Sequence, residues 1–82
     1  MHAGDPRADP AVVDLIELAG LWLAAQDRPA MDRTLERLCS ELERRFPSDQ
    51  EFAARFRELQ SLARARTSTE ELRRRYRRAS LG

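Results

Sequence analysis

Leu15-Ile16-Glu17-Leu18-Ala19-Gly20-Leu21-Trp22-Leu23-Ala24-Ala25 is the most apolar stretch of the chain. It contains a single charged residue, whereas 35% of all residues in the chain are charged. The run is well short of the roughly 20 apolar residues that a membrane-spanning helix needs. The stretch is therefore predicted to be a buried helical segment around which the other segments pack, and we expect no membrane partner.

The residues on either side of this stretch indicate where its helix begins and ends. Asp9 can cap the helix, and Pro10 stands at the first helical position, where its missing N–H is not needed. The turn Asp27-Arg28-Pro29 follows, so we expect a helix over 10–26. A second helix is predicted over 29–46 because its apolar residues recur every three or four positions. They are Met31, Leu35, Leu38, Cys39, Leu42 and Phe46.

Two capping-box patterns, each beginning with a serine, divide the second half of the chain into two predicted helices. Pro47 ends the second helix, and Ser48 to Glu51 has the pattern of a capping box, so a third helix is predicted over 49–65. A second capping box runs from Ser68 to Glu71, and the apolar register shifts there. We therefore expect a break at 66–68 and a short fourth helix over 69–80.

The fold class follows from these four segments. No stretch alternates with the two-residue period of a strand, so the chain is predicted to be all-α. Short connections favour an up-down antiparallel bundle or two stacked helical hairpins. Residues 1–8 lack periodicity and are expected to form a disordered tail, with a single helical domain over 9–82.

The charges nearly cancel, with fifteen basic residues, all arginine, against fourteen acidic ones. On the second helix we expect them to form a solvated face with pairs such as Arg33–Glu36, Arg37–Glu41 and Glu41–Arg45. Their distribution along the chain is uneven. Residues 1–29 carry two arginines against five acids, and residues 67–82 carry five arginines against two acids. This polarity can orient neighbouring chains, so charge bears on association more than on nucleic-acid affinity.

The sequence offers little for catalysis. Its only histidine is His2, in the predicted tail, and Cys39 lies on the apolar stripe of the second helix, where free cysteine behaves as a buried hydrophobe. Spaced carboxylates such as Asp32 and Glu36 have no histidine beside them to complete a metal site. We expect no enzyme activity, cofactor, metal or small-molecule substrate. The polar N-terminus and lone cysteine favour a cytoplasmic location.

The first helix is apolar on more sides than three amphipathic helices can cover. Its surplus surface is expected to contact a protein partner, and the candidate residues are Val13, Leu18, Leu21, Trp22 and Ala25. The sequence thus predicts a non-catalytic interaction or assembly module. It is expected to form a homodimer or to dock onto a larger cytoplasmic protein.

An alternative interpretation rests on the arginine-rich end of the chain. Arg73, Arg74, Arg77 and Arg78 can contact the phosphates of a nucleic acid or an acidic partner, with Tyr76 as a stacking aromatic. These arginines are expected to project around much of the helix, and the acidic first half of the chain would oppose DNA. Nucleic-acid binding is therefore the second hypothesis.

Overall fold

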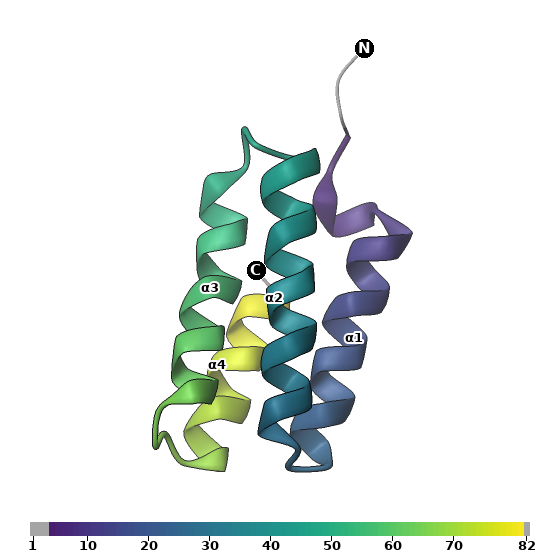
Figure 1. The fold of residues 1–82 in the computed structure, drawn as a ribbon. Coiled ribbons are helices and arrows are strands. Elements are labelled where there is room, and N and C mark those ends of the chain that lie inside the picture. Colours follow the sequence, from purple (N-terminus) through teal and green to yellow (C-terminus); the bar gives the residue numbers. More distant parts are fainter. Residues whose placement is uncertain (1–3, 82) are drawn as a thin grey trace.

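Four helices run antiparallel to one another in chain order (Figure 1). The computed structural model describes residues 4–81, and those residues contain no strand. The helices are α1 Pro10–Ala24, α2 Arg28–Arg45, α3 Gln50–Arg64 and α4 Thr69–Leu81. The all-α prediction is confirmed, with each boundary within two residues of the predicted one. Because α2 packs on both α1 and α3, the helices form one bundle.

The turn between α1 and α2 explains why α1 ends at Ala24. Gln26 has a left-handed backbone with φ 58°, and the Asp27 N–H donates to the Trp22 carbonyl at 2.9 Å. The Gln26 N–H donates to the Leu23 carbonyl at 3.0 Å, which completes a Schellman motif. Asp27 then caps α2, since its carboxylate accepts from the Ala30 N–H. One short turn therefore supplies hydrogen-bond partners to the last carbonyls of α1 and to the first N–H groups of α2.

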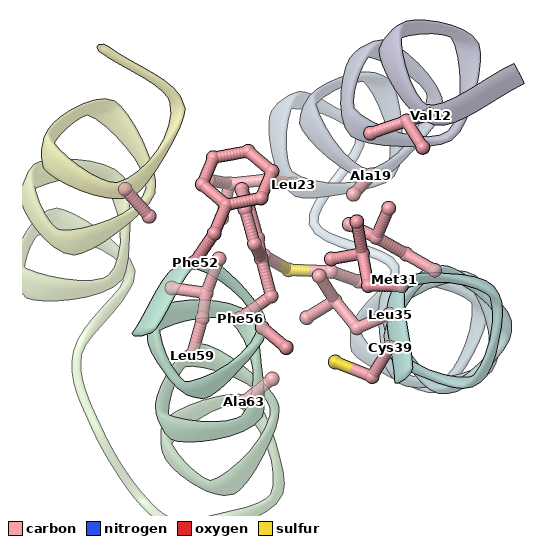
Figure 2. Close-up of a cluster of buried hydrophobic side chains, with 14 of the residues drawn as sticks. Val12, Ala19, Leu23, Met31, Leu35, Cys39, Phe52, Phe56, Leu59 and Ala63 are labelled. Atoms are coloured by element: carbon pink, nitrogen blue, oxygen red, sulfur yellow. The ribbon is translucent and has the colours of Figure 1, made fainter. Parts of the chain in front are cut away.

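The core is formed mainly by α1, α2 and α3, whose apolar side chains converge in Figure 2. The predicted stripe of α2 is fully buried, from Met31 to Phe46. On α3, Phe52 and Phe56 pack edge to face with ring centroids 5.2 Å apart. Such aromatic pairs bury a large area with defined geometry, so they fix how α3 lies against α1 and α2.

The N-terminal segment closes the end of the bundle that α4 does not reach (Figure 1). Pro6–Ala8 form a 3-10 turn, η1, in which Pro6 is buried. The Arg7 guanidinium stacks 4.4 Å from the centre of the Phe52 ring and contacts the Asp49 carboxylate at 3.4 Å. A disordered tail was predicted over 1–8, whereas residues 5–8 form this turn because it covers an otherwise open aromatic ring. Residues 1–3 lie outside the described residues.

The two predicted capping boxes differ in outcome. At α4, the Ser68 hydroxyl accepts from the Glu71 N–H at 3.2 Å as predicted, but the Glu71 carboxylate bonds to Arg74 and Arg75, so only the serine half of the box forms. At α3, Asp49 occupies the cap position and its side chain makes no capping hydrogen bond. The capping-box prediction for residues 48–51 is wrong, because the cap position falls on Asp49 and Ser48 lies one residue before it; the Asp49 carboxylate itself contacts Arg7.

A polar seam joins α2 to α3 along one edge of the core. Gln60 is only 3% exposed; its side-chain amide donates to Asp32 at 2.9 Å and to Glu36 at 3.0 Å. Arg57 bonds to both Glu36 and Glu43. The Gln60 amide and the Arg57 guanidinium lower the pKa of Glu36 below its ordinary value. Every polar group of this seam that loses water gains a charged or hydrogen-bonding partner, which burial requires.

The seam overturns part of the predicted charge pairing on α2. Because Glu36 turns to α3, the pair Arg33–Glu36 does not form. The Glu41 carboxylate bonds to Arg44 at 2.8 Å and approaches Arg45 at 3.6 Å. The predicted pair Glu41–Arg45 is therefore confirmed, and Arg37–Glu41 is wrong.

The contact between α1 and α4 depends on a glycine. The Tyr76 hydroxyl donates to the Ile16 carbonyl at 2.7 Å, and its ring lies against Gly20. A Cβ at position 20 would lie 2.8 Å from the Tyr76 Cζ, closer than two carbon atoms can pack. Gly20 therefore lets Tyr76 dock on the α1 backbone, although glycine is unfavourable within a helix.

We predict that Gly20→Ala changes the sign of its effect with the residue at position 76. In the native chain it lowers the free energy of unfolding, because the new methyl group displaces the Tyr76 ring and its hydrogen bond. In a Tyr76→Ala background it raises that free energy by about 1 kcal/mol through better helix propensity. Urea unfolding of the four chains followed by circular dichroism measures both effects. The same sign in both backgrounds contradicts the packing described here.

Candidate protein-interaction surface

Four of the five residues proposed for partner contact lie on one side of α1. Residues 18, 21, 22 and 25 fall within about 100° of each other at about 100° per residue. Leu18 is 37% exposed and Leu21 is 65% exposed, Ala25 is exposed, and Trp22 is half-buried against the core. We call Leu18, Leu21, Trp22 and Ala25 the outer face of α1. Leu18 and Trp22 border a groove with α2, so the other described helices cover this face only in part.

Val13 lies on a different side of the helix. It is half-buried and lines a groove with Ile16, Phe52 and Tyr76, between α1 and the end of α4. It points about 140° away from Leu18 and about 80° away from Leu21, the nearest member of the outer face. The prediction that Val13 belongs to the same contact surface is therefore wrong, because α4 packs against that side of α1.

A basic edge borders the outer face on the side of α2. A groove between the two helices is lined by Leu15, Leu18 and Trp22 from α1 and by Arg33 and Arg37 from α2, among others. Both arginines are exposed, and neither makes an ion pair or a side-chain hydrogen bond with another described residue. The sequence pattern placed them on a solvated face and did not link them to α1. Their relation to α1 depends on the antiparallel pairing of the two helices.

An acidic edge borders the outer face on the opposite side. Glu17 lies about 100° from Leu18 and about 40° beyond Leu21, away from the groove that Trp22 and Leu15 line with α2. Asp14 lies on the same side of Leu18 but only about 40° from it, so it stands at the N-terminal end of the strip. Both are exposed and unpaired within the part of the chain that the structure describes. The apolar strip is thus flanked by uncompensated negative charge on one side and uncompensated positive charge on the other.

The arginines of α4 form a second exposed surface. Leu72, Tyr76 and Ala79 turn toward the bundle, and the opposite side carries Arg73, Arg74, Arg77 and Arg78, all exposed. Their spacing confines these four arginines to an arc of about 140°, so they form one face, whereas with Arg75 the five arginines of α4 span about 200° of the helix. Arg74 pairs with Glu71, and the other three have no ion-pair partner among the described residues. We call these four residues the cationic face of α4.

Tyr76 does not belong to that cationic face. Its hydroxyl is bonded to Ile16 and its ring is packed on Gly20, so it is not available to stack on a base. Burial, together with the nearby Glu17 carboxylate, raises the pKa of Tyr76. The prediction of a stacking aromatic beside the arginines is therefore wrong.

The single thiol is enclosed by the core. Cys39 is 0% exposed, and burial raises its pKa to about 12 (Figure 2). A nucleophilic cysteine needs an exposed setting that lowers its pKa, and Cys39 has the opposite. Among residues 4–81, no group of histidine, cysteine, aspartate and glutamate side chains is arranged to hold a metal ion. His2 lies outside the described residues.

Comparisons with other proteins give no family assignment. The chain matches no protein-family model, no curated protein sequence and no solved structure. Among the helices that the structure describes, none has the length and apolar content needed to cross a membrane. The surfaces described above are therefore what bears on function.

We predict that the Cys39 thiol is labelled only when the protein unfolds. At mildly alkaline pH a disulfide-exchange reagent should react at the rate of unfolding, because the thiol is both enclosed and protonated. A Cys39→Ala chain carrying Ser40→Cys is the matched control, since Ser40 is exposed on the same turn and should react at once. Immediate labelling of Cys39 in the absence of denaturant contradicts its burial.

Proposed function

We propose that this protein is a non-catalytic interaction module that binds a cytoplasmic protein partner through the outer face of α1. The observation that carries the proposal is the exposure of Leu21 and Leu18 on the most apolar helix of the chain. Single exposed leucines are common, but adjacent ones beside a half-buried tryptophan form a contiguous strip. Strips of this kind are typical of protein contact surfaces.

The fold supports this proposal because the exposed strip is not needed for the core. The core already contains both phenylalanines of α3 and the complete stripe of α2. Leu21 contributes little to it, so its exposure carries no benefit for the isolated chain. A partner that covers Leu18, Leu21 and Trp22 would remove apolar surface from water. Each Å² buried would stabilise the complex by about 25 cal/mol.

We predict that a photoreactive amino acid at position 25 captures a partner in the cells from which the gene comes. Position 25 is exposed at the end of the outer face, so an occupant of that face lies within reach. The matched control carries the same group at Ser61, which is exposed on α3. A single adduct from position 25 and none from position 61 is expected.

The same experiment with Leu21→Asp separates binding from folding. Because Leu21 is 65% exposed, the substitution should change the free energy of unfolding by less than about 0.5 kcal/mol and remove the adduct. Equal labelling from positions 25 and 61, or an adduct that survives Leu21→Asp, would overturn the proposal.

A second candidate function is nucleic-acid binding through the cationic face of α4. It is favoured by the placement of four exposed arginines on one face, three of them without an ion-pair partner within residues 4–81. Guanidinium groups at this density can contact successive phosphates along a strand. The face carries no aromatic side chain, so it would contact the backbone and not the bases.

We predict the salt dependence that this second function requires. Replacing Arg73, Arg77 and Arg78 with glutamine should reduce the slope of log affinity against log salt by up to about three for duplex DNA. A chain with Arg33, Arg37 and Arg66 replaced loses the same charge from other surfaces and is the matched control. Fluorescence anisotropy measures both, and equal slopes or no binding at low salt would exclude this function.

A further inference from the structure

We infer that the occupant of the outer face of α1 is a second copy of this chain, packed so that the two α1 helices run parallel about a two-fold axis. The inference rests on the proposed function, since it identifies the partner of the same surface. It is carried by the charges on either side of the apolar strip, which are complementary to each other.

The two charged edges are unbalanced within one chain. Asp14 and Glu17 on one side, and Arg33 and Arg37 on the other, are exposed and have no ion-pair partner among residues 4–81. Other charged residues nearby are paired: Asp9 with Arg45, and Glu41 with Arg44 and Arg45. Unpaired charges also occur elsewhere among the described residues, as on the cationic face of α4, but those at the borders of the strip have opposite signs on its two sides.

The antiparallel pairing of α1 and α2 sets the height of each charge. Arg45 bonds to Asp9, so these two residues lie at the same level. Moving eight residues back along α2 reaches Arg37, and moving eight residues forward along α1 reaches Glu17. Because both helices rise about 1.5 Å per residue, Arg37 is level with Glu17, and Arg33 lies about one turn further on.

A two-fold axis parallel to the helices places the edges of the two copies in opposite order. Each residue keeps its height along the helix axis. The acidic edge of each copy then faces the basic edge of the other, and Glu17 meets the partner's Arg37 twice. An antiparallel two-fold keeps each edge against itself, so arginines face arginines and carboxylates face carboxylates. Like charges facing each other are unfavourable, so the charge pattern selects the parallel arrangement.

The size of the surface indicates how tight this dimer is. α1 has fifteen residues and is therefore about 22 Å long, which limits the contact to the low end of specific interfaces. We expect a reversible dimer that dissociates in the micromolar range. Salt weakens it, because the ion pairs at its border are partly exposed.

Charge reversal tests the arrangement, with self-association measured by sedimentation velocity across the micromolar range. Glu17→Arg and Arg37→Glu should each weaken self-association by about tenfold, since each change places like charges together at two positions. An equimolar mixture of the two variants should recover the native affinity, because the variant Arg at 17 meets the variant Glu at 37 and the other contact is native. Arg44→Glu, on an exposed part of α2 away from the strip, is the control and should have no effect.

Each other outcome is decisive. If Glu17→Arg associates more tightly with the native chain than the native chain does with itself, acidic edge faces acidic edge, the helices are antiparallel and the inference is wrong. If the native chain stays monomeric throughout, self-association is excluded. The cross-link from position 25 then separates the two proposals, since an adduct with a different protein preserves the proposed function alone and no adduct contradicts both.

Discussion

The contact of Tyr76 with Gly20 determines which side of α1 is exposed. α1 is apolar on most of its circumference, so its own sequence does not select a buried side. α2 covers one side through the core stripe, and α4 covers another because the Tyr76 ring docks on the glycine and bonds to Ile16. What remains is the strip from Leu18 to Ala25. The surface that we propose for partner binding is thus defined by a contact on the opposite side of the helix.

Helix positions were predictable from local signals. Asp9 with Pro10, Asp27 with Pro29 and Ser68 act within a few residues of themselves, so their effect does not depend on the rest of the fold. The apolar residues of α2 all fall on one side of that helix, and every core residue predicted there is buried. Four of the five proposed contact residues lie on a shared side of α1, and Val13 does not. Because apolar residues surround most of α1, their spacing does not indicate which side is buried and which is exposed.

The remaining features depend on residues far apart in the chain. Glu36 turns to Arg57 and Gln60 on α3 and leaves Arg33 unpaired, which helix spacing does not indicate. Gly20 is required by Tyr76, 56 positions later. Arg7 stacks on Phe52 because α4 is too short to cover that end of the bundle. Each of these contacts follows from tertiary packing, and each changes the charge or exposure of a candidate surface.

The ionic contacts between and within the helices are all made by guanidinium groups, since the chain contains no lysine. Arginine stays protonated at every pH at which proteins are studied, so alkaline conditions leave these pairs intact. Their carboxylates behave differently: hydrogen bonds from Arg57 hold the pKa of Glu43 below its ordinary value, and those from Arg75 do so for Glu71. A depressed pKa in the folded state contributes stability above the unfolded value, and that contribution is lost as the pH falls through the folded value. The stability that these ion pairs contribute is therefore lost at low pH and not at high pH.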